Sequence, residues 1–320
     1  MHNVSEVLPD TEFQVAAFYC FTPLQEESIV FLLESLNKNA LEGQVRGTIL
    51  LAAEGINGTV CGPVKGVSSL LQKLQEACLE NTLDVKLSWT HVQAFRRFKA
   101  RRKCEIVTMG VAGIDPNNSV GIYVEPLHWN AYLSDPETLV IDTRNEYEIA
   151  IGSFKGSVNP YTDTFREFPA WVDDNLNSLV EEKCTKRIAM FCTGGIRCEK
   201  ATSYLLKEGF KEVHHLHGGI LRYLDEVPQE ESLWDGECFV FDQRVALNHD
   251  LAPGVHHLCH ACGRPLAPED LKSLSFLRGI QCAYCEDLYT DQDRSRFAER
   301  QRQIDERSAK HAENSSRPIA

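Results

Sequence analysis

The segment with the clearest chemical potential is Met190–Lys200, which reads MFCTGGIRCEK. In it, Cys192 follows an apolar strand candidate and precedes two glycines and the start of a predicted helix. This pattern predicts a thiol at the C-terminal edge of a sheet, where backbone N–H groups and a helix N-terminus stabilise an anion. Arg197 adds a positive charge five residues further on. Both effects lower the pKa of a thiol and favour a thiolate or persulfide at neutral pH.

We therefore predict that Cys192 is a catalytic nucleophile, the alternative being a buried structural cysteine at a strand end. The loop predicted to cradle an anion on its sulfur consists of Thr193, Gly194, Gly195, Ile196, Arg197 and Cys198. The role of Cys198 stays open, because a neighbouring thiol either resolves an oxidised Cys192 or is inert.

A second polar segment, with the sequence DTRNEYE, follows the predicted strand Thr138–Asp142. Its Asp142, Arg144 and Glu148 are candidate supporting residues. We expect them to brace the sheet edge by ion pairing rather than to take part in the reaction, because carboxylate–arginine pairs are more often architectural than catalytic.

Two further groups of residues suggest binding. The segment RRFKARRK places six cations in eight positions, and Phe95 and Phe98 interleave them. Cations bind phosphates and aromatic rings stack on unpaired bases, so an RNA-binding patch is predicted; a solvated charged face is the alternative. The predicted RNA-binding residues are Arg96, Arg97, Lys99, Arg101, Arg102 and Lys103.

The other group is two C-x2-C pairs separated by nineteen residues, Cys259 with Cys262 and Cys282 with Cys285. Two such pairs complete a tetrahedron of thiolates, so a structural zinc site is predicted. A triplet of histidines, His214, His215 and His217, is a weaker candidate for iron. We find no glycine fingerprint for a nucleotide or flavin cofactor.

Composition limits the remaining possibilities. The chain has 320 residues, 36.1 kDa and a formal charge of −13. This acidity argues against indiscriminate coating of nucleic acid but leaves room for a local basic patch. There is no apolar run long enough to span a membrane and no secretory signal, so a cytoplasmic protein is expected. Twelve cysteines in such a compartment are read as thiols, ligands or catalysts.

The predicted elements fall into modules that would position these residues. The N-terminal part alternates as βαββαβ, with a tight turn at Glu54–Gly58, and suggests a ferredoxin-like or acylphosphatase-like α+β domain. The middle part, with strands at Thr138–Asp142, Arg187–Phe191 and Val213–Leu216, suggests a parallel sheet flanked by helices. The expected segments are 1–118 for the N-terminal domain, 119–236 for the α/β domain, 237–290 for the zinc region and 291–320 for a charged helical or disordered tail.

Several motifs together resemble a known family. CTGGIR resembles the sulfur-handling loop of the rhodanese superfamily, and Ser153 stands where many rhodaneses have histidine. The segments AAEGINGTV, FRRFKARRKCEIVT, IDTRNEYE, FREFPAWV, FCTGGIRCEKA and HLHGGI are together similar to the rhodanese-related tRNA uridine hydroxylases. The resemblance implies a rhodanese domain and oxygen-dependent conversion of the wobble uridine in a tRNA anticodon loop to 5-hydroxyuridine, with Cys192 as the essential residue.

Two alternatives remain beside this expectation. The same loop suits a sulfurtransferase that passes persulfide sulfur from Cys192 to a protein or RNA. It also suits a binding module with a redox-sensing cysteine. The sequence leaves the tRNA set, the electron source and the oligomeric state open.

Overall fold

A computed structural model describes the backbone of residues 12–315 and the side chains of residues 12–307. Contacts divide the chain into two units, Met1–Gly254 and Val255–Ala320. The first unit contains both predicted sheets, and the second contains the two cysteine pairs. The narrower boundaries expected at residues 118, 236 and 290 remain predictions.

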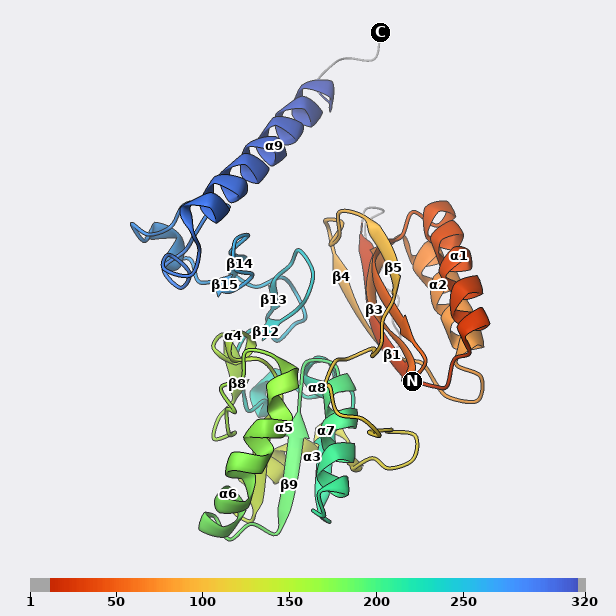
Figure 1. Ribbon diagram of the computed structural model, residues 1–320, viewed down its shortest axis with the longest axis vertical. Coiled ribbons are helices and arrows are strands. Elements are labelled where there is room, and N and C mark those ends of the chain that lie inside the picture. Colours follow the sequence, from red (N-terminus) through yellow and green to blue (C-terminus); the bar gives the residue numbers. More distant parts are fainter. Residues whose placement is uncertain (1–11, 316–320) are drawn as a thin grey trace. The chain divides into compact units, whose positions relative to one another are not determined.

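The N-terminal part of the first unit is a five-stranded sheet with two helices on one face (Figure 1). The predicted βαββαβ order is present, and the basic segment adds a fifth strand that runs parallel to β2. The strand order is β4-β1-β3-β2-β5. The elements are β1 (Phe13–Phe21), α1 (Glu26–Glu42), β2 (Arg46–Ala52), β3 (Gly55–Gly62), α2 (Val64–Ala77), β4 (Asp84–Thr90) and β5 (Phe98–Arg102).

The predicted turn at Glu54–Gly58 is wrong in its extent, because β3 already begins at Gly55. Gly55 has a φ of +146°, and a Cβ on it would lie 2.1 Å from the carbonyl oxygen of Cys20 on β1. The glycine therefore serves close approach of two paired strands rather than a longer turn.

Side chains on this sheet alternate between two faces, as the period of two in a strand requires. One face packs on the helices through buried residues that include Phe18, Ile49 and Ile56. The other face is more polar and carries Tyr19, Lys86 and their neighbours. This second face contributes to the candidate site.

The rhodanese-like part of the first unit contains a four-stranded sheet of order β6-β10-β9-β7, in which every pair is parallel. This confirms the predicted parallel sheet and its three predicted strands. The strands are β6 (Ile122–Val124), β7 (Thr138–Asp142), β9 (Arg187–Phe191) and β10 (Val213–Leu216), and the flanking helices include α3 (Pro126–Ser134), α4 (Glu146–Ile149), α7 (Ile196–Lys207) and α8 (Gly219–Glu226).

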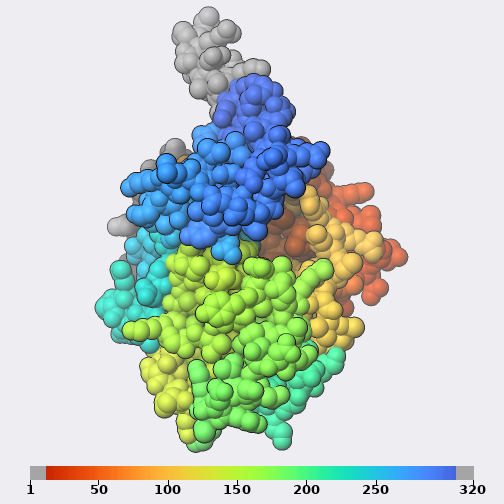
Figure 2. All heavy atoms as spheres, turned by 60° about the vertical axis from the view of Figure 1, so that its left-hand side comes forward, coloured from red at the N-terminus to blue at the C-terminus, as the bar shows by residue number. Residues whose placement is uncertain are grey.

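The helical segment between β8 (Gly152–Phe154) and β9 changes its winding along its length. It passes from a 3-10 turn at Phe165–Glu167 through α5 (Phe168–Trp171) and a π-helical stretch at Val172–Leu176 to α6 (Asn177–Glu182). None of the residues of α6 is buried. In the space-filling view, the green part of the chain that contains α6 lies on the surface (Figure 2).

The remaining elements are short except for the last helix. β8 (Gly152–Phe154) pairs with β11 (Trp234–Gly236), and β12 (Cys238–Phe239) pairs with β13 (Ala246–Leu247). The second unit holds the β14 (His257–Leu258) and β15 (Pro265–Leu266) pair and the long helix α9 (Asp291–Ser315). No helix within residues 12–315 combines the length and the hydropathy needed to cross a bilayer.

Candidate active site and metal centre

Cys192 occupies the position that its sequence context predicts. It follows the last residue of β9, and α7 begins four residues later, at Ile196. The N–H of Gly195 donates a hydrogen bond to the sulfur of Cys192 over 3.1 Å. Gly195 has a φ of +99°, a conformation that glycine adopts at little cost and that turns this N–H toward the sulfur. The loop is therefore a short anion cradle at the C-terminal edge of the sheet.

The surroundings of Cys192 favour its thiolate. Its complete burial raises the pKa, but hydrogen bonding from the Cys198 thiol, the charge of Arg197 and the backbone N–H groups of Cys198 and Arg197 outweigh burial and lower it to about 5. Burial and the neighbouring thiolate raise the pKa of Cys198 well above the ordinary thiol value. At neutral pH the pair therefore holds a single charge, on Cys192, with Cys198 as a protonated donor.

The guanidinium of Arg197 is held in place by Glu148. This guanidinium forms a two-pronged pair with Glu148, with N–O distances of 2.7 and 2.8 Å, and donates to the hydroxyl of Thr193. The pair is buried. Burial alone would raise the pKa of Glu148, but the charge and hydrogen bonds of Arg197 have the larger effect, so this pKa is lowered. The arrangement holds a permanent positive charge behind the loop.

Asp142 and Arg144 lie side by side beneath this loop. Both side chains are fully buried, and Arg144 donates to both carboxylate oxygens of Asp142 and to the carbonyl of Gly152. Ser153 also donates to Asp142, at 2.8 Å. These contacts tie β7 to β8, and neither side chain lines the pocket that contains Cys192. Their geometry is that of a brace between two strands, and their supporting role stays a prediction.

A pocket of about 320 Å³ contains Cys192, within the ~300–1,000 Å³ usual for small-ligand sites. Most of its wall comes from three parts of the first unit, and the wall is completed by Val107, Asn145, Thr164, Phe165 and Leu221. The rhodanese-like loop supplies Cys192, Thr193, Gly194, Ile196 and Arg197; the polar face of the N-terminal sheet supplies Val15, Ala17, Tyr19, Asn57, Thr59, Lys86 and Ser88; and the segment after α8 supplies Val240, Phe241, Asp242, Arg244 and Leu251.

Buried polar contacts hold the N-terminal sheet against the loop. The hydroxyl of Tyr19 donates to Glu199 over 2.8 Å, and Tyr123 donates to the other oxygen of the same carboxylate. Lys200, which is 2% exposed, pairs with Glu54 and Glu105. Since Glu199 and Lys200 directly follow the cysteine loop, these contacts fix the position of the loop relative to the sheet.

Sequence reasoning missed the pocket residues of the N-terminal sheet, above all Tyr19 and Lys86, and also missed Arg244. One signal was available: Asp84, Lys86 and Ser88 alternate with Val85 and Leu87, which indicates a strand with one polar face. Nothing in the local sequence shows that this face meets Cys192, because the contact joins segments more than one hundred residues apart.

The six predicted RNA-binding residues do not share one face. Arg96 and Arg97 precede β5 and Lys103 follows it, and all three are exposed. Lys99 and Arg101 pair with Thr48 and Leu50, which in turn pair with Thr59 and Asn57 of the pocket. These two cations therefore lie on the pocket's face of the sheet. Arg102 lies on the helix-covered face, where it pairs with Glu26 at 2.7 Å.

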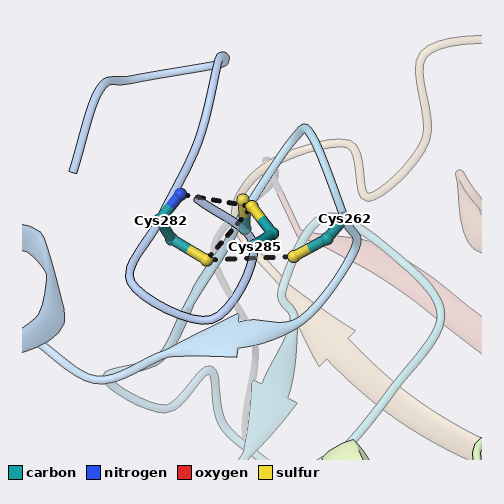
Figure 3. A group of neighbouring side chains, drawn as sticks. Cys262, Cys282 and Cys285 are labelled. Carbon is teal, nitrogen blue, oxygen red and sulfur yellow. Dashed lines mark hydrogen bonds between the residues drawn. The ribbon is translucent and has the colours of Figure 1, made fainter. Parts of the chain in front are cut away.

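The four cysteines of the second unit come together around one centre. Their sulfur atoms all lie within 4.8 Å of one another, and three of the residues are buried. The sulfur of Cys282 lies 3.8 Å from that of Cys262 and 3.6 Å from that of Cys285 (Figure 3). A tetrahedral zinc ion with Zn–S distances of ~2.3 Å separates its ligands by ~3.8 Å, so the group fits zinc.

This is the one group of three or more potential ligands that converges in the part of the chain that the structure describes. The histidines considered for iron behave differently. His215 is buried against the ring of Tyr123, and His217 pairs with Glu125 at 2.9 Å. They bring no third ligand to a common point among the described side chains.

Fold and site together define a class: a rhodanese-type domain with an activated loop cysteine, joined to an acylphosphatase-like domain. Comparison with protein families agrees. Residues 13–106 match the UPF0176 acylphosphatase-like domain, and residues 128–226 match the rhodanese-like domain.

Whole-chain relatives define the family more closely. The chain is 60% identical over 311 residues to the tRNA uridine(34) hydroxylase of one strain of Prochlorococcus marinus, covering 97% of both chains. It is 60% identical to the protein of the same name from the Prochlorococcus marinus strain MIT 9303, covering 93% of this chain and 96% of that one. It is 56% identical to that of Parasynechococcus marenigrum strain WH8102, covering 98% of both. The chain belongs to the tRNA uridine(34) hydroxylase family.

Proposed function

We propose that this protein hydroxylates C5 of the uridine at position 34 of tRNA to give 5-hydroxyuridine, with participation of the Cys192 thiolate. One oxygen atom of dioxygen enters the base, and a two-electron reductant converts the other to water. The family supplies the reaction, because its named members act on uridine 34 of tRNA. The observation that carries the proposal is the sulfur of Cys192, which accepts a hydrogen bond from the loop and lines a pocket shared by the rhodanese-like loop and the N-terminal sheet.

The pocket suits a single nucleobase that leaves its stack. Apolar side chains such as Val15, Leu221 and Val240 offer contacts to its faces, and polar groups stand at a few positions around them. Bases in an anticodon loop are unpaired, so moving one into a pocket costs only a few kcal/mol of unstacking. In this proposal Cys192 reacts, the loop amides and Arg197 hold its charge, and Glu148 positions Arg197.

The four-cysteine group has a separate role. Four thiolates around one zinc ion leave no open coordination position, so we assign this group to folding of the second unit rather than to the reaction. The residues fit the metal by donor type and by spacing.

The RNA surface follows from the sheet register. Lys99 and Arg101 lie on the face that leads into the pocket, and no carboxylate among the described side chains lies within ion-pair distance of either. Repulsion from Arg97 and Arg101 lowers the pKa of Lys99, as expected for crowded cations without counter-ions. We therefore assign phosphate contacts to Lys99 and Arg101, with Arg96, Arg97 and Lys103 beside them, and exclude Arg102.

Neighbouring arginines allow a matched test of this surface. Arg101→Gln should weaken tRNA binding several-fold and reduce the slope of log affinity against log salt by ~1, since one phosphate contact is lost. Arg102→Gln should leave that slope unchanged, because its side chain pairs with Glu26 on the other face. Filter binding across a salt series measures both. Equal effects from the two variants would refute the assignment.

Nucleoside mass analysis tests the function itself. In cells that lack the protein, wild type should restore 5-hydroxyuridine in tRNA, Cys192→Ser should not, and the exposed-thiol control Cys184→Ser should. Restoration of a thiolated base instead would identify a sulfurtransferase. Full activity of Cys192→Ser would leave only a binding or redox-sensing role for the cysteine.

A further inference from the structure

Lys86 brings an unusual group into the pocket of Cys192. It belongs to β4 of the N-terminal sheet, and its side chain is 6% exposed. Its ammonium lies 2.5 Å from a carboxylate oxygen of Asp84 and 4.5 Å from the centre of the Tyr19 ring. A lysine buried this completely is rare unless it is paired or functional.

The hydrogen bonds of this ammonium are not all used. An ammonium has three donors and no acceptor. Asp84 accepts one hydrogen bond and the Tyr19 ring faces the charge, while no second oxygen acceptor lies within hydrogen-bond distance among the described residues. At least one N–H of Lys86 is therefore available to a molecule in the pocket.

The other pocket cations are held differently. Arg197 is occupied by Glu148 and Thr193, and Arg244 by Asp242 and the hydroxyl of Ser88. Asp84 is not among the pocket-lining residues, although Lys86 is. Lys86 is therefore the residue of the pocket wall whose ammonium still has an unused donor.

The geometry of uracil decides which of its atoms would meet this donor. Carbonyl O4 is attached to C4, the direct neighbour of the reacting C5, whereas O2 lies on the opposite side of the ring. In a base that offers C5 to Cys192, O4 therefore lies close to the sulfur, and O2 points away from it. Lys86 and Cys192 both line the one pocket, so a base held there can meet both side chains.

We propose that Lys86 is the specificity-determining residue that donates a hydrogen bond to O4 of the target uridine and thereby excludes cytidine. Cytidine carries an amino group in place of O4, so two donors would face each other at this position. Sites built around such a hydrogen bond reject the mismatched analogue far more strongly than apolar pockets do. This inference rests on the proposed hydroxylation of uridine.

Substitutions at Lys86 separate recognition from folding. Glutamine can donate to O4 of uridine or accept from the amino group of cytidine, so Lys86→Gln should make 5-hydroxycytidine appear beside 5-hydroxyuridine. Arginine is a donor without an acceptor, so Lys86→Arg should keep the preference for uridine. Lys86→Met should lower 5-hydroxyuridine at least tenfold. Lys65→Met, an exposed lysine on α2, serves as the matched control and should behave as wild type.

The measurement is mass analysis of both hydroxylated nucleosides in total tRNA from cells that express each variant in place of the wild-type protein. We expect wild type to give 5-hydroxycytidine below about 1% of 5-hydroxyuridine, and Lys86→Gln to raise that ratio at least tenfold. Circular dichroism and tRNA binding show whether each variant is folded. If Lys86→Gln does not fold, the wild-type protein is compared with the Lys86→Met and Lys86→Arg variants instead.

The outcomes distinguish the two levels of the proposal. Absence of 5-hydroxyuridine with the wild-type protein would reject the proposed function. If the wild-type protein is active, two results would overturn the role of Lys86 alone. One is a folded Lys86→Gln variant with the wild-type ratio of the two nucleosides. The other is a folded Lys86→Met variant with the wild-type yield of 5-hydroxyuridine.

Discussion

The two cysteine clusters of this protein contain the same chemical group in opposite surroundings. Around Cys192, backbone N–H groups, a neighbouring thiol and Arg197 all present positive charge to one sulfur that lines a pocket. In the second unit, four sulfur atoms lie within 4.8 Å of one another and face a common centre. The first arrangement leaves a thiolate available for reaction, whereas the second requires a metal cation to balance its charge.

The comparison shows that the number of cysteines in a motif says little about reactivity by itself. A single thiolate that receives hydrogen bonds from the loop keeps its lone pairs for a substrate. Four thiolates shared with one zinc ion would have no such freedom, because each lone pair directed inward becomes a metal bond.

The largest expected effect concerns metal binding, which should belong to one cluster only. Cys282→Ser should weaken zinc binding at least ~100-fold and loosen the second unit, because zinc binding contributes directly to folding. Cys192→Ser should retain about one zinc per chain. Competition with a chromogenic chelator measures both. Normal zinc content in Cys282→Ser, or loss of zinc in Cys192→Ser, would break the distinction.

A smaller effect is expected at the neighbour of the reactive sulfur. Cys198→Ala removes the strongest favourable hydrogen bond to the Cys192 thiolate, so the pKa of Cys192 should rise by about one unit or more and its thiolate fraction near pH ~5 should fall several-fold. Cys198→Ser keeps a hydroxyl donor and should shift the pKa less. The pH dependence of alkylation of Cys192 measures this shift. Identical profiles for all three proteins would show that Cys198 does not hold the charge.

The smallest effect tests the loop that turns an N–H toward the sulfur. Gly195→Ala should cost ~1–2 kcal/mol of folding free energy, because its φ is +99° and the new Cβ would approach the Tyr19 hydroxyl to 3.0 Å. Gly194→Ala meets no atom within 4 Å and should cost less than ~0.5 kcal/mol. Urea denaturation compares the two variants. Equal costs would mean that the conformation of Gly195 does not stabilise the loop.

Local sequence predicted the parts of this structure that local sequence controls. The strand before Cys192, the glycines after it and the helix that follows form one continuous stretch, so their order alone indicates the cradle. The spacing of the two C-x2-C pairs likewise indicates convergence of the four sulfurs, and the structure brings them together.

The rest of the site depends on contacts between distant segments. Lys86 enters the pocket because β4 pairs with β1 and because Tyr19 of β1 is anchored to Glu199 beside the cysteine loop. Arg102 lies outside the proposed RNA surface because the basic segment forms a strand, which sends alternate side chains to opposite faces. A charge run read as a single patch misses this alternation, and strand register becomes visible only once the sheet is assembled.

The most direct test of the account is the pH dependence of the reaction of Cys192 with iodoacetamide, followed by peptide mass spectrometry. Only the thiolate reacts, so the rate should be half-maximal near pH ~5 and level off above pH ~6, because the pKa is lowered to about 5. The exposed thiol of Cys184 in the same chain provides the internal control for the labelling reaction. A midpoint for Cys192 at or above the ordinary thiol value of ~8.5 would contradict the central claim that the loop holds a thiolate.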